Sequence, residues 1–319
     1  MRANIETINI SKKERDFLKE HLNIWWLRPE SALWDAIASA TISQSKINAP
    51  SLDLGCGNGL FSFITSGGCF APSYDWFRNV DVEGFWENKD IFDTDCGIEI
   101  SEHIIKKPNF KFTYGLDHKN NLLVQAEKLN FYNHLITHDA NNPLPFPDGS
   151  MKTVFSNILY WLKDPIMTLG EVSRILEDGG RALVCLPNSN FYDFCESYRW
   201  KEKKSELLRI INRGRSDNIL WVANKDEFSL QAKNVGLTVV HHKYYLSKQT
   251  LEIWDTGLRP FSPYLIYMAN RLPNKEREQV KIKWVEDINK LLLELYKSDK
   301  MLREERGFQF FELEKNDTN

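Results

Sequence analysis

The sequence predicts an α/β protein whose core is a doubly wound sheet, with mostly parallel strands that alternate with helices. A glycine-rich turn directly follows a short apolar strand at 51–55, and apolar runs recur at 154–155 and 182–186. Such runs are typical of parallel strands buried on both faces. Between the last two runs, Asp164 followed by a proline predicts a helix start, and the Gly-Gly pair at 179–180 predicts its end.

Strand–helix alternation continues along most of the chain. The expected strands lie near 51–55, 111–117, 134–138, 152–157, 181–186, 237–245 and 307–314. We expect one domain over 1–319 with three additions: an N-terminal helical cap at 1–45, an insertion at 66–109 after the first sheet helix, and a helical excursion at 247–305. In a sheet of this kind, a ligand binds at the carboxyl ends of the strands.

The turn after the first strand reads Ser-Leu-Asp-Leu-Gly-Cys-Gly-Asn-Gly-Leu over residues 51–60. Glycine allows a positive φ and lets a ligand approach the backbone. The helix that follows offers free amides, which favour an anionic group. The dinucleotide fingerprint is G-x-G-x-x-G, and the turn here is one residue shorter. This difference weakens the interpretation as an NAD(P)-dependent dehydrogenase.

With Asp53 two residues before its first glycine, the turn resembles motif I of the class I S-adenosylmethionine (SAM)-dependent methyltransferases. The resemblance continues through His138-Asp139-Ala140, the Leu-Pro-Phe-Pro-Asp loop at 144–148, a strand, a proline-led helix and the Gly-Gly turn. This order is similar to the ubiquinone/menaquinone-biosynthesis branch (methyltransferase type 11), and the resemblance covers residues 50 to 188. It implies a Rossmann-like methyltransferase fold with seven strands, the last antiparallel.

The resemblance also implies SAM as the cofactor and a set of residues that bind it. These residues are Arg28, Asp53, Gly55, Cys56, Gly57, Leu116, Asp117, Asp139, Ala140, Asn157 and Tyr160.

Each part of the cofactor has an expected partner in that set. The glycines would approach the methionine and ribose portion, with Asp53 near the amino end. Asp117 would hold the ribose diol, and Asp139 with the amide of Ala140 would contact the adenine. Asn157 would face the methionine ammonium.

Two further expectations concern the edge of the cofactor pocket. Tyr160 with Trp161 would line the methyl-transfer zone. Arg28, just before a helix that starts at Pro29 and runs to about Ser43, could pair with the methionine carboxylate or could be a solvated arginine beside a packing tryptophan.

The ribose acid is normally about 20 residues beyond the glycine turn, and here the insertion delays it. Asp117 is preferred because it ends a strand-like run and precedes a helical segment at 121–131. A competing assignment places this acid inside the insertion, at Asp90, Asp93 or Glu99.

The insertion is rich in aromatic and acidic residues between Phe70 and Asp95. Aromatic faces beside carboxylates suit a sugar, or an amine through cation–π contact and ion pairing. The insertion could therefore bind the acceptor, or its aromatic side chains could anchor a long loop to the sheet.

These features predict an enzyme that aligns an acceptor oxygen or nitrogen with the activated methyl group, which is mainly catalysis by positioning. The acceptor class is a small molecule or glycan. No catalytic base is identified, since His118 and His138 fit cofactor-shell or packing roles better. The alternative is a non-catalytic SAM-fold binding or regulatory protein.

Composition sets limits on partners and location. The net charge is −3 and the isoelectric point about 6.2, which disfavours nucleic acid as a partner. The five cysteines show neither a C-x-x-C pair nor a zinc pattern, so no metal is expected. Neither a signal peptide nor an apolar run long enough to span a bilayer is visible, which predicts a cytoplasmic protein. An amphipathic helix from Asn274 to about Met301 predicts packing on the core, with a homodimer contact or a membrane-surface contact as the alternative.

Overall fold

The computed structural model describes residues 8–78, 80, 82, 99–199, 206, 219–302 and 306–317. Its main sheet has seven strands in the order β5-β4-β1-β6-β7-β9-β8. Along the chain their bounds are β1 Ser51–Leu54, β4 Phe112–Asp117, β5 Tyr132–Thr137, β6 Met151–Ser156, β7 Leu176–Pro187, β8 Leu237–Ser247 and β9 Arg306–Lys315. Strand β9 pairs antiparallel with both of its neighbours, β7 and β8, whereas the other neighbouring strands of this sheet pair parallel. The predicted fold class and the reversed last strand are confirmed.

Helices cover the sheet and its carboxyl edge. Those that alternate with the strands are α3 Leu60–Thr65, α4 Asn120–Lys128, α5 Pro165–Ile175 and α9 Lys225–Asn234. The others are α1 Lys12–Ile24, α2 Pro29–Ile42, α6 Glu196–Arg199, α10 Lys248–Thr256, α11 Ser262–Asn270 and α12 Asn274–Met301. Short 3₁₀ turns lie at η3 Ile100–His103, η4 Leu159–Trp161, η5 Tyr192–Phe194 and η6 Arg259–Phe261.

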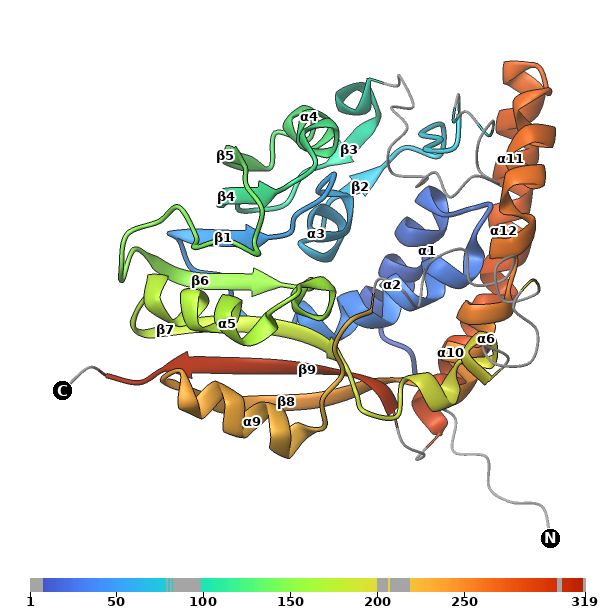
Figure 1. Cartoon of the computed structure of the whole chain (residues 1–319). Coiled ribbons are helices and arrows are strands. Elements are labelled where there is room, and N and C mark those ends of the chain that lie inside the picture. The colour runs from blue at the N-terminus through green and yellow to red at the C-terminus, as the bar shows by residue number, and fades with distance from the viewer. Residues whose placement is uncertain are drawn as a thin grey trace, which may run out of the picture.

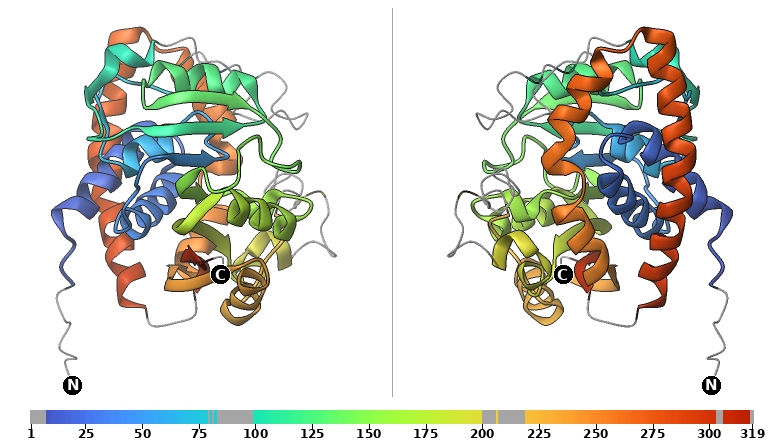
Figure 2. Two further views of the ribbon diagram at one scale, coloured as in Figure 1. Left: turned by 90° about the vertical axis from the view of Figure 1, so that its left-hand side faces the viewer. Right: turned by 90° about the vertical axis from the view of Figure 1, so that its right-hand side faces the viewer.

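The N-terminal helices α1 and α2 lie beyond the carboxyl ends of the central strands. In Figure 1 the arrowheads of β1 and β6 point toward them, while β9 points the other way. The right-hand panel of Figure 2 looks at this edge and shows the long helix α12 beside the blue N-terminal helices, with which it is in contact. Helices from both ends of the chain therefore cover the edge where a ligand is expected.

Helix α5 begins as predicted but ends earlier. The Asp164 carboxylate accepts a hydrogen bond from the Met167 amide at 2.9 Å. The helix stops at Ile175, and Leu176 is already extended as the first residue of β7. The prediction that Gly179-Gly180 ends the helix is wrong. These glycines lie in a bulge of β7, because the register with β6 shifts between Met151 and Thr153.

The described part of the insertion packs as core. Its short strand β2 Cys69–Phe70 pairs with β3 Ile104–Lys106. Tyr74, Trp76 and Phe77 are each at most 1% exposed. These aromatic residues anchor the segment, as the alternative interpretation proposed. Of the other aromatic and acidic residues that suggested an acceptor site, Phe85, Trp86, Asp90, Phe92 and Asp93 lie outside the described residues.

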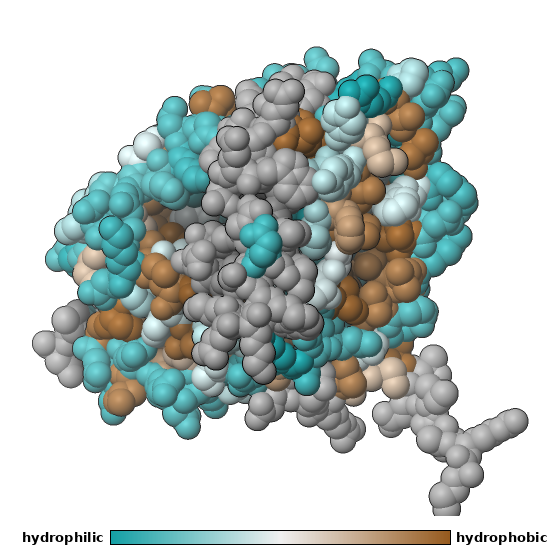
Figure 3. Space-filling model, turned by 45° about the vertical axis from the view of Figure 1, so that its right-hand side comes forward, coloured by the Kyte–Doolittle hydropathy of each residue, from teal (hydrophilic) through white to brown (hydrophobic). Residues whose placement is uncertain are grey.

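The excursion before β9 carries exposed apolar side chains. Figure 3 shows apolar surface gathered on the right of the view, the side on which α11 and α12 lie in Figure 1. The large apolar side chains of η6 and α11 that are exposed are Phe261, Tyr264, Tyr267 and Met268. A homodimer contact stays a prediction. Within the described ranges, no helix has the length and apolar character needed to cross a membrane.

Candidate active site

The glycine turn is fastened to the end of the neighbouring strand β4. The amides of Gly55 and Cys56 both donate to the Leu116 carbonyl oxygen, at 2.8 and 3.0 Å. The Gly57 amide donates to Asp117 Oδ2 at 2.9 Å. Five of the predicted site residues are thus brought together across two parallel strands.

Two of these glycines are required for different reasons. Both have a positive φ, +79° at Gly55 and +55° at Gly57. A Cβ on Gly55 would lie 2.4 Å from the Ile158 side chain, so this glycine lets the loop after β6 pack against the turn. A Cβ on Gly57 would meet nothing closer than Leu122 at 4.0 Å. The backbone at Gly57 therefore has an open side that a ligand can approach.

Asp117 is held at the end of β4 with both carboxylate oxygens in use. Besides the bond from Gly57, its Oδ1 accepts from the Lys119 amide at 2.9 Å. His118 Nδ1 lies 3.5 Å from the same oxygen. Because a carboxylate oxygen can accept more than one hydrogen bond, Asp117 retains acceptor capacity for a diol. Of the competing ribose acids, Glu99 is exposed and accepts from the Ser101 hydroxyl, whereas Asp90 and Asp93 fall in the undescribed part of the insertion.

Asp53 lies beneath the turn. Its side chain is only 2% exposed, and Oδ2 accepts from the Tyr132 hydroxyl at 2.7 Å. Burial raises the pKa of Asp53 to about 6, opposed by hydrogen bonds from Ser62 and Tyr132. Its contacts tie β1 to α3 and β5, so Asp53 supports the turn from below. Its predicted contact with the cofactor stays a prediction.

Asp139 and Ala140 follow β5 and have different exposures. Asp139 is exposed, and its Oδ1 accepts from the Asn141 amide at 2.9 Å and from Asn141 Nδ2 at 2.8 Å. These bonds hold the pKa of Asp139 below its usual value. Ala140 is buried, and its carbonyl accepts from the Thr168 hydroxyl at 2.9 Å. The loop is therefore ordered by its own polar contacts while the Asp139 carboxylate stays accessible.

Two buried polar atoms at strand ends lack a partner among the described residues. They are Asn157 Oδ1, just after β6, and His138 Nε2, just after β5. A buried polar atom that makes no hydrogen bond is costly and needs an explanation such as a missing ligand. With the open side of Gly57, this evidence fits a polar ligand lying across the ends of β4, β1, β5 and β6.

Tyr160, in the 3₁₀ turn after β6, is buried against the first residues of β9. Its ring meets Phe308 edge-on at 5.5 Å and Trp161 at 5.2 Å. Burial raises the pKa of its hydroxyl, which therefore stays neutral. Trp161 is 50% exposed, so of the two predicted wall residues Tyr160 faces the interior.

The N-terminal helices add a carboxylate that sequence reasoning missed. Asp35 on α2 accepts from Trp25 Nε1 at 2.8 Å, and His21 Nδ1 lies 3.8 Å from the same oxygen. Burial raises the pKa of Asp35 to about 7, opposed by the Trp25 hydrogen bond and the charge of Arg28. Burial also lowers the pKa of His21 to about 3, so this imidazole is neutral. One signal was present in the sequence: an acid within an otherwise apolar helical stretch, directly after Trp34.

Arg28 lies in the same group, at the start of α2. Its guanidinium carbon is 5.6 Å from the Trp25 ring centroid, and its Nε is 3.9 Å from Glu30 Oε1. Its side chain is 12% exposed. The predicted contact with a cofactor carboxylate is neither supported nor contradicted by this packing.

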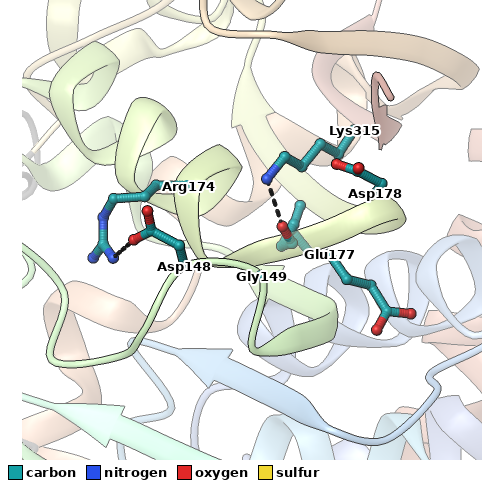
Figure 4. Close-up of a pocket in the computed structure, with 7 residues that line it drawn as sticks. Asp148, Gly149, Arg174, Glu177, Asp178 and Lys315 are labelled. Carbon is teal, nitrogen blue, oxygen red and sulfur yellow. Dashed lines mark hydrogen bonds and ion pairs between the residues drawn. The ribbon is translucent and has the colours of Figure 1, made fainter. Parts of the chain in front are cut away.

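A separate surface hollow lies away from these residues. Figure 4 shows Arg174 on Asp148 at 2.7 Å and Lys315 Nζ on the Leu176 carbonyl at 2.7 Å, whereas the Glu177 side chain points away from them. It is formed where β6 and β7 begin and β9 ends, the edge of the sheet opposite the glycine turn. Because its two cations are held by Asp148 and by the Leu176 carbonyl, and because it lies far from the glycine turn, we assign it no role in the chemistry.

Comparison with known proteins agrees with this geometry. Residues 94–184 match the model of the family Methyltransf_11, described as a methyltransferase domain. The chain contains a methyltransferase domain. The matched range holds Asp117, Asp139, Asn157 and Tyr160, and the glycine turn precedes it. The match implies SAM as the cofactor and does not determine the acceptor.

Solved structures of methyltransferases resemble the chain at low identity. One is a complex of the Haloferax volcanii Trm112 methyltransferase activator with a putative methyltransferase, with 15% identity, 97% of this chain and 100% of that chain covered, and a TM-score of 0.45. Another is a putative sarcosine dimethylglycine methyltransferase from Galdieria sulphuraria. It is 12% identical, the match covers 91% of this chain and 86% of that chain, and the TM-score is 0.44. No curated protein matches the chain.

Proposed function

We propose that the methyltransferase domain moves the methyl group of SAM to an oxygen or nitrogen atom of a small molecule or glycan-type acceptor. The observation that carries this proposal is the glycine turn. Its amides are bonded to Leu116 and Asp117, and the open side of Gly57 lies at the same sheet edge as the unpaired Asn157 Oδ1. A ligand with a diol and an ammonium group would satisfy both ends of this edge.

Four groups of the chain would hold SAM. Asp117 would accept hydrogen bonds from the ribose diol, and Asp139 with the Ala140 amide would contact the adenine edge. Asn157 Oδ1 would accept from the methionine ammonium, and Arg28 would pair with the methionine carboxylate. SAM supplies a methyl group already activated on a sulfonium. What remains for the protein is to orient the two reactants and to exclude water.

Helices α1 and α2 supply that enclosure over the carboxyl ends of the strands. The Ser39 hydroxyl on α2 and the Thr65 hydroxyl on α3 are 2.6 Å apart, which ties the cap to the helix after the glycine turn. The described aromatic residues of the insertion are buried in the core. The acceptor is therefore expected beneath the cap, beside Tyr160, and not against those aromatic residues.

The test begins with the cofactor. Isothermal titration of the purified protein with SAM and, separately, with NADH should show binding of SAM alone. Asp117→Ala should weaken SAM binding strongly, because the variant removes the acceptor for both the diol and the Gly57 amide. Asp16→Ala, an exposed carboxylate on α1, is the matched control and should bind as the wild type does. SAM binding that survives Asp117→Ala would keep the cofactor but move the ribose contact into the insertion. A folded protein that does not bind SAM would contradict the proposal.

A second assay separates the enzyme from the non-catalytic alternative. Tritium from methyl-labelled SAM should enter the small-molecule fraction of a deproteinised cell extract when the wild-type protein is present. Incorporation that requires Asp117 would support an enzyme with a small acceptor. Tight binding of SAM without transfer to any fraction would instead favour a binding or regulatory protein.

A further inference from the structure

Asp35 is a carboxylate with one oxygen fixed and the other available. Trp25 Nε1 holds Oδ2 at 2.8 Å, whereas Oδ1 accepts no hydrogen bond from the residues that the structure describes. The Asp35 side chain is 23% exposed, although most of α2 is packed into the core. A fixed carboxylate with a free, reachable oxygen is the arrangement that a proton acceptor needs.

The indole that fixes Asp35 is itself held rigidly. The Trp25 ring lies 5.0 Å from the Trp76 ring and 5.9 Å from the Phe77 ring, both of which are buried. Arg28 lies over the same indole. The described part of the insertion thus supports Trp25, and through Trp25 it sets the direction of the Asp35 carboxylate.

Asp35 also lies where methyl transfer is proposed. His21 on α1 contacts the ring of Phe61, in the first turn of the helix after the glycine turn, at a centroid distance of 5.9 Å. On the other side, the neighbouring Trp34 packs on the Phe308 ring at 4.9 Å, and Tyr160 packs on the same ring at 5.5 Å. Burial raises the pKa of the Tyr160 hydroxyl, and the negative charge of Asp35 contributes to this rise. The part of α2 that carries Asp35 is therefore linked by packing both to the helix after the glycine turn and to the turn after β6.

The groups that face Asp35 leave it as the proton acceptor of this region. His21 on α1 is neutral, since burial lowers its pKa to about 3. Burial raises the pKa of Tyr160 after β6, of Cys185 on β7 and of Tyr245 on β8, so these groups keep their protons. Arg28 is the cation that acts on Asp35 and favours its charged form. A carboxylate that titrates near neutral pH is suited to take a proton during catalysis.

We propose that Asp35 is the general base of the methyl transfer, an assignment that rests on the proposed function. Asp35 Oδ1 takes the proton that the hydroxyl or amine group of the acceptor loses. The lone pair of that oxygen or nitrogen forms the bond to the methyl carbon. The electron pair of the broken carbon–sulfur bond stays on sulfur, so the positive charge of the sulfonium is neutralised and the proton remains on Asp35.

Asp35→Asn tests this assignment, because the amide keeps the shape and an acceptor for Trp25 but cannot take a proton. Asp16→Asn is the matched control. We expect both variants to bind SAM as the wild type does in calorimetry. We expect tritium transfer from labelled SAM into the cell extract to fall about 100-fold or more in Asp35→Asn only. Over the range from about pH 5 to about pH 9, the wild-type rate should decline below about pH 7, and the residual rate of Asp35→Asn should lack this decline.

Three results would overturn the assignment. Transfer by Asp35→Asn at the wild-type rate would exclude a base at this position. Loss of SAM binding in Asp35→Asn would make Asp35 a cofactor residue. Failure of the wild-type protein to bind SAM would remove the proposed function and this assignment together.

One further measurement covers the case in which the wild type binds SAM but the extract holds no acceptor. Carbon-13 NMR of aspartate-labelled protein bound to S-adenosylhomocysteine can follow the Asp35 carboxyl, identified as the resonance missing from Asp35→Asn. Titration near pH 7 would support the assignment. Titration near the ordinary aspartate pKa of about 4 would overturn it.

Discussion

Two groups of buried polar residues in this molecule differ in how completely they are paired. Between α1, α12 and the start of the insertion, Asp75 accepts from Trp26 Nε1 at 2.9 Å and from Arg277 Nε at 2.6 Å. Nearby, Lys281 Nζ donates to Asn23 Oδ1 at 2.7 Å and to the carbonyls of residues 72 and 74. At the carboxyl edge of the sheet, Asn157 Oδ1 and His138 Nε2 are buried with no described partner.

The difference separates structure from function. The buried charges of the first group are paired, although Arg277 Nη2 makes no hydrogen bond to a described residue. Buried charges are tolerated when they are paired, and such a network fixes one arrangement of the elements around it. A buried polar atom left without a partner is a cost that a ligand can remove. We therefore interpret the first group, the α1–α12 network, as a structural joint and the second as part of a binding site.

The largest effect is expected from breaking the ion pair of the α1–α12 network. Arg277→Ala leaves the Asp75 carboxylate buried without its guanidinium, which should lower the free energy of unfolding by about 3–5 kcal/mol. Urea unfolding followed by tryptophan fluorescence measures the change. The double variant Asp75→Asn/Arg277→Met, which removes both charges, should recover much of the loss. An unfolding free energy unaltered by Arg277→Ala would mean that the pair is not closed in solution.

The α1–α12 network also predicts a pH dependence of stability. Burial lowers the pKa of Lys281 from 10.5 to about 8. Between these values the unfolded chain holds a proton that the folded chain has lost, so the free energy of unfolding rises with pH from about 8 to about 10.5. The gain is on the order of 3 kcal/mol. Lys281→Met should lack this rise, and equal slopes in the two proteins would contradict the lowered pKa.

Two asparagines give a direct test of the contrast. Asn157→Ala removes an unpaired buried oxygen, so stability should hold or rise, whereas SAM affinity should fall by about 1.5–3 kcal/mol, the worth of a hydrogen bond to a charged group. Asn23→Ala removes a partner of Lys281 and should have the reverse effect: lower stability and unaltered SAM affinity. Thermal unfolding and calorimetry of both variants decide the matter. A loss of stability in Asn157→Ala would show that its side chain is already satisfied by the protein.

Features of the fold could be predicted from the sequence where they depend on neighbouring residues, and not where they depend on residues far apart in the chain. The strands were predictable because each is a short apolar run, and Asp117 because it ends one of them. The start of β7 could not be predicted, because Leu176 is extended only through its pairing with Met151 of β6. The Gly-Gly pair that follows forms a bulge of this strand, whereas local rules interpret such a pair as a helix end. Asp75 and Arg277 are 202 positions apart, so nothing local reveals their pairing.

Asp35 and Asp53 illustrate the same limit within the site. Asp35 was missed because a lone acid on a helix is usually solvated, and the tyrosines whose pKa its charge affects come from the turn after β6 and from β8. Asp53 was predicted as a cofactor contact from its place in the motif. Its hydroxyl partner Tyr132 comes from β5, distant in sequence. Motif spacing placed both the glycine turn and Asp117 at the carboxyl edge of the sheet, where their contacts with the cofactor stay predictions. It could not distinguish a residue that faces this edge from one that supports the turn.

The most local test compares two glycines that share a positive φ. Gly179, with φ +73°, has no atom within 4 Å of an added Cβ, whereas at Gly55 the Ile158 side chain lies 2.4 Å away. Gly179→Ala should therefore cost only backbone strain, about 1–2 kcal/mol of stability, and leave SAM binding intact. Gly55→Ala should add a clash that displaces the turn, with a further cost of about 1–3 kcal/mol. Where that displacement moves the Gly57 amide off Asp117, SAM affinity should fall about 10- to 100-fold. Equal SAM affinities in the two variants would mean that the turn yields without moving its amides, and that its bonds to β4 do not position the cofactor.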